Sequence, residues 1–236
     1  MTERKDFLVE LGTEELPPKA LKTLSNSFEN SLKEGFKTAQ IQYDAIKAFA
    51  APRRLAVLVR GLETRQPGKE VARRGPGVKG ACDADGNATK AAQGFAQSCG
   101  VTVEALGRLK TDKGEWLQFE AEEAGKETAS LIPDMVETAL AKLPIPKRMR
   151  WGDRSAEFVR PAHWLVLMLG EDVVDAEILE LKSGNETRGH RFHAPDEIAV
   201  SSYEDYAQAL KRAHVVIDRA ERAAAIQAEA ESLAFA

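Results

Sequence analysis

The feature that most constrains the fold of this 236-residue chain is a helical pattern set among short apolar runs near its start. Five apolar residues recur at intervals of three and four, as on one face of an amphipathic helix: Leu21, Leu24, Phe28, Leu32 and Phe36. Apolar runs at 7–11, 46–50 and 55–62 predict strands around it. Because such a helix must bury its apolar face against a sheet, we expect an α+β fold with mixed or antiparallel sheets flanked by helices.

In the rest of the sequence, predicted strands alternate with predicted helices, and the last segment is helical. Helices are predicted over 88–99, 102–106, 129–143, 203–213 and 218–234, and strands over 116–121, 158–159, 164–169 and 173–181. The Gly-, Pro- and charge-rich stretch 66–87 predicts a long exposed loop. We therefore expect an α+β body over 1–200, in one or two subdomains. We also expect a helical region to begin over 201–236, its last helix continuing into a larger protein because it lacks a terminator.

Composition indicates a globular protein of a reducing compartment. Hydrophobic residues make up 43% of the chain, enough for a sizeable core. Cys82 and Cys99 are its only cysteines, and the charged N-terminus leads into a strand pattern rather than a secretory segment. The longest apolar run, 164–169, is too short to cross a bilayer. We expect a cytoplasmic protein with no membrane partner.

Positive charge is concentrated in three windows of the sequence. Lys and Arg outnumber Asp and Glu in 52–79, 147–163 and 182–193, although the whole chain has a net charge of −4. Segregated charge allows a mildly acidic protein to present a local positive surface to phosphates. The alternative is that these residues are solvated faces and loop ends.

Two segments within these windows combine cations with aromatic rings. TRGHRFH (187–193) carries two arginines, two histidines and a phenylalanine, and KRMRW (147–151) places Trp151 after a basic run. Charge beside a ring suits phosphate contact and stacking of an unpaired base. The alternative for Trp151 is a core position with the basic side chains extending around it. The candidate RNA-binding residues are Arg53, Arg54, Arg73, Arg74, Lys147, Arg148, Arg150, Trp151, Arg188, His190, Arg191 and His193.

Other chemical motifs are incomplete. DADGN (83–87) resembles the start of a calcium loop, but Gly94 stands where a bidentate Glu is required, so we expect an Asp-Gly turn. His190 and His193 lack a Cys or acidic partner at metal-site spacing, so we expect them to be donors to phosphate or sugar. The chain has neither a Walker motif nor a nucleophile elbow, and we predict no catalytic residue and no metal.

The sequence resembles the β subunit of bacterial glycyl-tRNA synthetase. Seven segments carry the resemblance, in order and over essentially the whole chain: LVELGTEELPP (8–18), APRRLAV (51–57), RGP (74–76), DADGN with TKAA (83–92), PKRMRWGD (146–153), FVRPAHW (158–164) and SGNETRGHRFH (183–193). Each segment is weak by itself, whereas seven collinear ones are highly specific.

The resemblance implies a noncatalytic part of a larger enzyme. In that family two α and two β subunits form a heterotetramer, the class II site for glycine, ATP and Mg lies on α, and the longer β chain contributes recognition of tRNA(Gly). The chain would be the N-terminal part of β and would bind no cofactor. Its cations would contact phosphate and sugar and position tRNA for the α active site.

Two further functions remain open from sequence. The basic segments could pack against other domains or the α subunit as a structural scaffold, since Arg is also enriched in protein interfaces. The chain could also be a freestanding RNA-processing enzyme with an unrecognised site.

Overall fold

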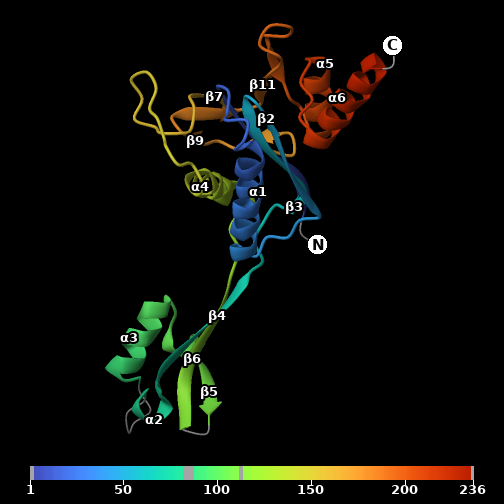
Figure 1. Cartoon of the computed structure of the whole chain (residues 1–236). Helices are drawn as coiled ribbons and strands as arrows, with labels where there is room; N and C mark the ends of the chain where they lie inside the picture. Colours follow the sequence, from blue (N-terminus) through green and yellow to red (C-terminus); the bar gives the residue numbers. More distant parts are fainter. Residues whose placement is uncertain (1–2, 82–87, 112–113, 235–236) are drawn as a thin grey trace. The chain divides into compact units, whose positions relative to one another are not determined.

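The computed structural model describes residues 3–81, 88–111 and 114–234, which form two compact units. Unit 1 combines Met1–Gln66 with Lys126–Ala236, and unit 2 is Pro67–Gly125. Figure 1 shows the elements of each unit along the chain. No helix among the described residues is long and apolar enough to cross a membrane.

Unit 1 is built on one mixed sheet whose strand order is β2-β3-β1-β7-β10-β9. The strands are β1 (Arg4–Thr13), β2 (Ala45–Ala51), β3 (Arg54–Glu63), β7 (Ala162–Leu169), β9 (Glu177–Ile178) and β10 (Leu181–Gly184), with β8 (Asp172–Val173) paired to β7. Pairing is antiparallel except between β10 and β7. β11 (Glu186–Arg188) and β12 (Glu197–Ala199) form a separate antiparallel pair.

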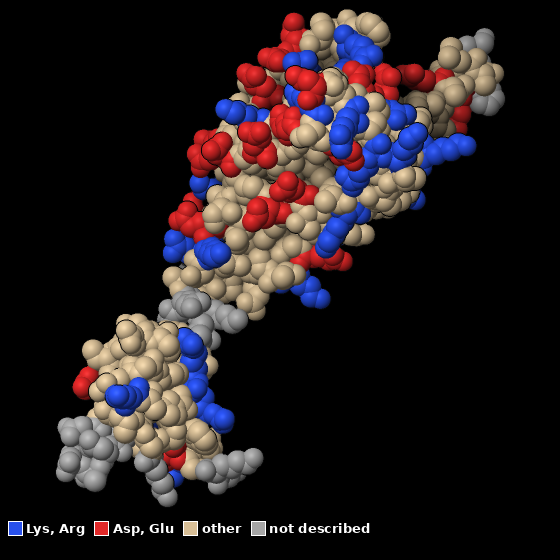
Figure 2. Space-filling model, turned by 90° about the vertical axis from the view of Figure 1, so that its left-hand side faces the viewer, with Lys and Arg blue, Asp and Glu red and all other residues tan. Residues whose placement is uncertain are grey.

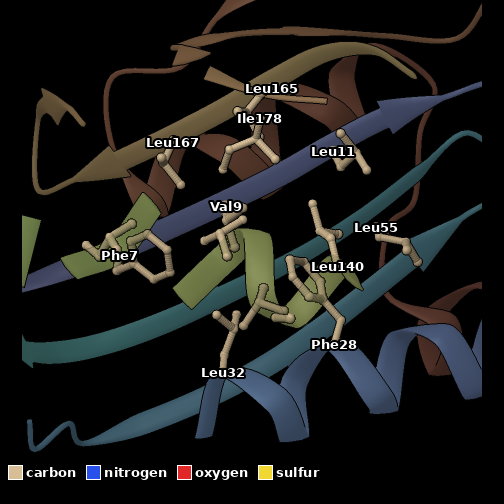
Figure 3. Close-up of a cluster of buried hydrophobic side chains, with 14 of the residues drawn as sticks. Phe7, Val9, Leu11, Phe28, Leu32, Leu55, Leu140, Leu165, Leu167 and Ile178 are labelled. Carbon is tan, nitrogen blue, oxygen red and sulfur yellow. The ribbon is translucent and has the colours of Figure 1, made fainter. Parts of the chain in front are cut away.

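One face of the sheet is covered by two helices, α1 (Leu21–Thr38) and α4 (Thr128–Ala141). Alternate residues of β1, Phe7, Val9 and Leu11, point into this layer and are fully buried. Figure 3 shows them in one cluster with Phe28 and Leu32 of α1 and Leu140 of α4. The predicted amphipathic helix is therefore confirmed, and it covers the strands on either side of it in sequence.

The opposite face of the sheet is also buried. Leu8, Leu58 and Val166 point to this side, where α5 (Tyr203–Arg212) contributes Tyr206 and Leu210. The side chains of Tyr206 and Leu210 are both completely buried. The final helix, α6 (Arg219–Ala234), has no buried residue. Burial on both faces explains why the strands are nearly continuous apolar runs.

Unit 2 is a smaller α+β arrangement. Its antiparallel sheet has the order β4-β6-β5, made of β4 (Lys69–Gly77), β6 (Gly114–Glu123) and β5 (Gly107–Thr111). The helices are α2 (Val78–Ala81), α3 (Lys90–Cys99) and the 3-10 turn η1 (Val103–Ala105). Its described core is small and consists of Ala81, Ala92 and Leu117. Thr89 caps α3 by accepting a hydrogen bond from the Ala92 backbone N–H.

The fold class is confirmed, but four expectations about its parts are wrong. The strand expected over 158–159 is only an isolated antiparallel bridge between Phe158 and Met149. The loop expected over 66–87 is largely strand β4 and helix α2, because β4 pairs along β6. The strand expected over 173–181 is broken into β8, β9 and the start of β10, since Leu179 and Glu180 adopt left-handed backbone (φ 55° and 59°). No compact unit ends at residue 200, because α5 packs into the core of unit 1. The Asp-Gly turn expected at 83–87 lies outside the described residues.

Candidate nucleic-acid interface

Four of the motif segments meet on the α5 face of unit 1. In the sheet, Gly12 of β1 is opposite both Arg54 of β3 and Trp164 of β7. Gly12 is required here because a Cβ at this position would lie 1.9 Å from Cε2 of Trp164. The indole ring therefore covers Gly12, and β11 brings Thr187 and Arg188 to the same place.

Glu10 is the centre of a buried polar network. Its Oε1 accepts hydrogen bonds from Trp164 Nε1 and Thr187 Oγ1, and its Oε2 accepts from the Tyr206 hydroxyl and from Arg54 Nη1 at 3.1 Å. Arg54 also donates to Thr187 Oγ1 at 3.0 Å and to the Arg188 carbonyl. Both carboxylate oxygens are satisfied, which a buried charge requires. The network joins β1, β3, β7, β11 and α5.

The electrostatics of this network keep Arg54 and Tyr206 protonated. Burial by itself would lower the pKa of Arg54, but its interactions with Glu10 and Tyr206, led by the negative charge of Glu10, outweigh burial and the pKa is raised. Burial, followed by the charge of Glu10, raises the pKa of Tyr206 well above its ordinary value of 10.0. Tyr206 is therefore a neutral hydrogen-bond donor over the whole physiological range.

Arg54 does not fit its predicted role as an RNA contact. The residue is 2% exposed and paired with Glu10, which is 0% exposed. A guanidinium in this position cannot reach a phosphate while unit 1 is folded. The sequence places Arg54 beside the exposed turn at Pro52-Arg53, but the strand register turns its side chain inward.

Glu14 organises a second, more exposed cluster just beyond the end of β1. Its carboxylate accepts hydrogen bonds from Arg191 and from His163 Nε2 at 3.0 Å, and Arg53 Nη2 lies 3.8 Å away. Arg191 also lies 3.5 Å from Glu15. Burial would raise the pKa of Glu14, but Arg191, with Arg53 and His163, outweighs it and the pKa lies below its usual value.

Arg53 is the least satisfied cation of this cluster. Its side chain is 21% exposed, and its Nε is buried with no hydrogen-bond partner among the described residues. Burial lowers the pKa of Arg53, and the neighbouring charge of Arg191 lowers it further. The guanidinium carbons of Arg53, Arg54 and Arg188 lie 5.9, 5.6 and 5.7 Å from the Trp164 ring centre, within cation–π range.

The loop after β11 presents an aromatic side chain to solvent. Gly189 is buried, and only glycine fits there because a Cβ would lie 2.6 Å from the Ala194 carbonyl oxygen and 2.7 Å from the Cβ of Ala213. The backbone N–H of His190 donates to the Ala213 carbonyl, and its Nδ1 accepts from the N–H groups of Phe192 and His193. The His190 and His193 rings lie 4.6 Å apart. These anchors leave Phe192 80% exposed.

Comparison with known proteins identifies the family. The model of the glycyl-tRNA synthetase β subunit matches residues 7–236. The chain is 53% identical to the glycine–tRNA ligase β subunit of Marinobacter nauticus and 51% identical to that of Hahella chejuensis, over 98% of this chain and 33% of each relative. It is 48% identical to the Haemophilus influenzae subunit, over 98% of this chain and 34% of the relative. The chain belongs to the glycyl-tRNA synthetase β subunit family. It spans about a third of the length of these relatives.

The basic segment KRMRW (147–151) follows α4 in the chain. Arg148 donates to the backbone carbonyls of Ala141 and Glu157, and Arg150 pairs with the Glu157 carboxylate at 2.8 Å. Trp151 packs partly buried against the core of unit 1, as the structural alternative predicts. Lys147 is exposed and has no acidic partner within 3–81, 88–111 and 114–234.

The third pair of predicted contacts, Arg73 and Arg74, belongs to unit 2. Arg73 donates to the Ser98 carbonyl at 3.1 Å, and the Arg74 guanidinium lies 4.5 Å from the Trp116 ring centre. Both side chains are exposed on β4. They belong to a different unit from the Arg53, Arg188 and Arg191 cluster, which is part of unit 1.

Sequence reasoning missed the carboxylates that partner the predicted cations. Arg53, Arg54, Arg150, Arg188 and Arg191 each have an acidic partner in the structure. A glutamate inside the apolar run LVELG (8–12) was the available signal, since a buried carboxylate needs a cation. Figure 2 shows many acidic side chains scattered over the visible face of the larger unit, with Lys and Arg more frequent toward its right-hand side.

Proposed function

We propose that this chain is the N-terminal part of a glycyl-tRNA synthetase β subunit that contributes tRNA binding and α2β2 assembly without catalysing a reaction itself. Glycine activation with ATP and Mg takes place on the α subunit, and this part of β binds neither. Support comes from identities of about half with curated β subunits over nearly the whole chain. The protein carrying it acts in the cytoplasm.

The observation that carries the tRNA part of the proposal is the convergence of Arg53, Arg188 and Arg191 on one surface with the exposed ring of Phe192. Guanidinium groups beside a stackable ring suit a sugar-phosphate backbone with an unpaired base. These contacts position RNA and carry little base discrimination.

The free energy of each ion pair decides which of the paired cations can still bind RNA. An exposed ion pair such as Arg188–Glu197 contributes roughly 0–1 kcal/mol, so a phosphate can replace the carboxylate at little cost. Breaking a buried pair such as Arg54–Glu10 costs about 3–5 kcal/mol. We therefore retain Arg53, Lys147, Arg148, Arg150, Arg188, His190, Arg191 and His193 as proposed RNA contacts in unit 1 and remove Arg54.

One observation favours a second candidate function, a scaffold without RNA contact. The carboxylate of Glu14 already binds Arg191 and His163, so these side chains have an internal role. In that case the cluster orders the junction between β1, β7 and the 189–193 loop, and RNA binding falls to other parts of the β subunit.

Photo-crosslinking separates the two functions. tRNA(Gly) transcribed with 4-thiouridine is irradiated with the chain, and crosslinked peptides are identified by mass spectrometry. The proposal predicts crosslinks to peptides containing Arg53 or 188–193. Crosslinks confined to other peptides, or none at all, would favour the scaffold. RNA turnover in the absence of α would instead favour a freestanding RNA-processing enzyme.

A further inference from the structure

A groove outside the predicted windows gathers cations from three separate parts of the chain. Its volume is about 680 Å³, and its walls come from the first turns of α1, from β2 and from the first turns of α6. Its charged side chains are Lys19, Lys22, Lys47, Asp218, Arg219 and Arg222. Five cations face one carboxylate, in a chain whose overall net charge is −4.

Two of the five cations hold the walls of the groove together. Lys47 Nζ pairs with Asp218 at 2.6 Å, which fixes β2 to the start of α6. Arg222 donates to the carbonyls of Val216, Ile217 and Ala50, and it joins the same two elements. Burial is the main cause that lowers the pKa of Arg222. The groove is therefore a built feature of unit 1.

The other three cations are available to a ligand. Lys19, Lys22 and Arg219 are exposed and have no acidic partner among the residues that the structure describes. α1 begins beside them, and its N-cap residue, Ala20, makes no side-chain hydrogen bond to the helix. An uncapped helix N-terminus adds positive potential and backbone N–H donors. Ser25 and Asn26 add polar side chains to the same wall.

We infer that this groove binds the sugar-phosphate backbone of tRNA, a second RNA contact that rests on the proposed function and extends it to the α1–β2–α6 side of unit 1. The chemistry favours nucleic acid over a protein partner. Lys is depleted in protein interfaces, whereas Lys and Arg without partners gain affinity from phosphate by releasing counterions. Lys19 and Lys22 supply this charge from one end of the groove and Arg219 from the other.

A matched pair of charge reversals on one helix tests the inference. Lys22→Glu changes a groove residue, and Lys37→Glu makes the same change at the far end of α1, where the side chain is also exposed and is not in the groove. We expect Lys22→Glu to weaken binding of a tRNA(Gly) transcript at 0.1 M salt by about five-fold or more, as loss of a phosphate contact does. Arg219→Glu should match it, and Lys37→Glu should change affinity less than two-fold, as expected for a charge away from the contact.

The outcomes distinguish this inference from the proposed function. Equal effects of Lys22→Glu and Lys37→Glu would overturn the groove as a specific contact. If Arg188→Glu weakens tRNA binding but the groove variants do not, the inference fails and the proposed function stands. If the unaltered chain shows no tRNA binding, the proposed function fails first. If Lys22→Glu weakens association with the α subunit but leaves tRNA binding unchanged, the groove is a protein interface and the inference is wrong. Circular dichroism of each variant confirms that it is folded.

Discussion

The Glu10 carboxylate and the Arg54 guanidinium form an ion pair 3.1 Å long in the interior of unit 1, where both side chains are buried. The pair lies between the sheet and α5, and every carboxylate oxygen has two donors. Removal of one partner leaves a buried charge unpaired, so loss of either side chain should destabilise the unit strongly.

Replacing Arg54 should destabilise unit 1 strongly. Arg54→Met keeps the alkyl part of the side chain but leaves Glu10 buried without its cation, and we expect a loss of about 3–5 kcal/mol in the free energy of unfolding. The control is Arg65→Met, which breaks the exposed pair with Glu127 and should cost about 0–1 kcal/mol. Urea denaturation followed by tryptophan fluorescence measures both. Equal losses would show that the buried network does not hold the unit together.

Gly12 should tolerate no side chain. Gly12→Ala places a Cβ on the Trp164 indole, and the overpacking should cost about 1–3 kcal/mol of stability. Gly184→Ala is the matched change in another strand of the same sheet, where the nearest atom to a new Cβ, the Glu186 nitrogen, is 4.0 Å away. That variant should be neutral or slightly more stable. A thermal melt of both proteins checks the difference, and a neutral Gly12→Ala would contradict the packing described.

The buried Tyr206 predicts a loss of stability in alkali. Its pKa is raised above 10.0 in the folded protein, so above pH 10 the unfolded chain releases the phenol proton while the folded chain retains it. Stability should fall above pH 10 by at most about 1.4 kcal/mol per pH unit from this group, and below pH 10 the group contributes no pH dependence.

Tyr206→Phe isolates that effect. The variant should be less stable at neutral pH by about 1.5–3 kcal/mol, since Glu10 loses a hydrogen bond. The difference in free energy of unfolding between the two proteins should then narrow between pH 10 and 11, because only the protein with Tyr206 has a phenol proton that the unfolded chain releases in this range. A difference that stays constant across that range would mean that Tyr206 is not a buried donor.

Phe192 should contribute to RNA binding through its exposed ring. Phe192→Ala removes a stacking surface without removing charge, and we expect a loss of about 1–3 kcal/mol in binding to tRNA(Gly) with unpaired bases. Val173→Ala, which shortens another exposed apolar side chain in unit 1, is the control and should have no effect. Fluorescence anisotropy measures both. Equal affinities would assign Phe192 to a different contact.

Sequence patterns predicted the sheet and its covering helices because the apolar run at 7–11 and the three-and-four spacing in 21–36 depend only on local sequence. The partners of the cations depend on register, which places Gly12 beside Arg54 and Trp164. Sequence order does not contain that information. Arg53 and Arg54 therefore look equivalent in sequence, although only Arg53 reaches the surface.

The α1–β2–α6 groove was missed for a related reason. Its cations come from positions 19–22, 47 and 219–222, and none of these is a basic window by itself. Only the packing of α6 on β2, held by Arg222 and by the Lys47–Asp218 pair, brings them together. The windows that were visible in sequence proved to be rich in internal ion pairs instead.

The salt dependence of tRNA(Gly) binding shows whether Arg188 and Arg191 contact phosphate groups of the RNA. Affinity of the chain is measured between 50 and 200 mM salt, with and without the charge reversals Arg188→Glu and Arg191→Glu. We expect a straight line of log affinity against log salt with a negative slope of about 0.7–0.9 per phosphate contacted, and a shallower slope in the variants. Affinity that does not change with salt, or a slope that the variants leave unaltered, would contradict it.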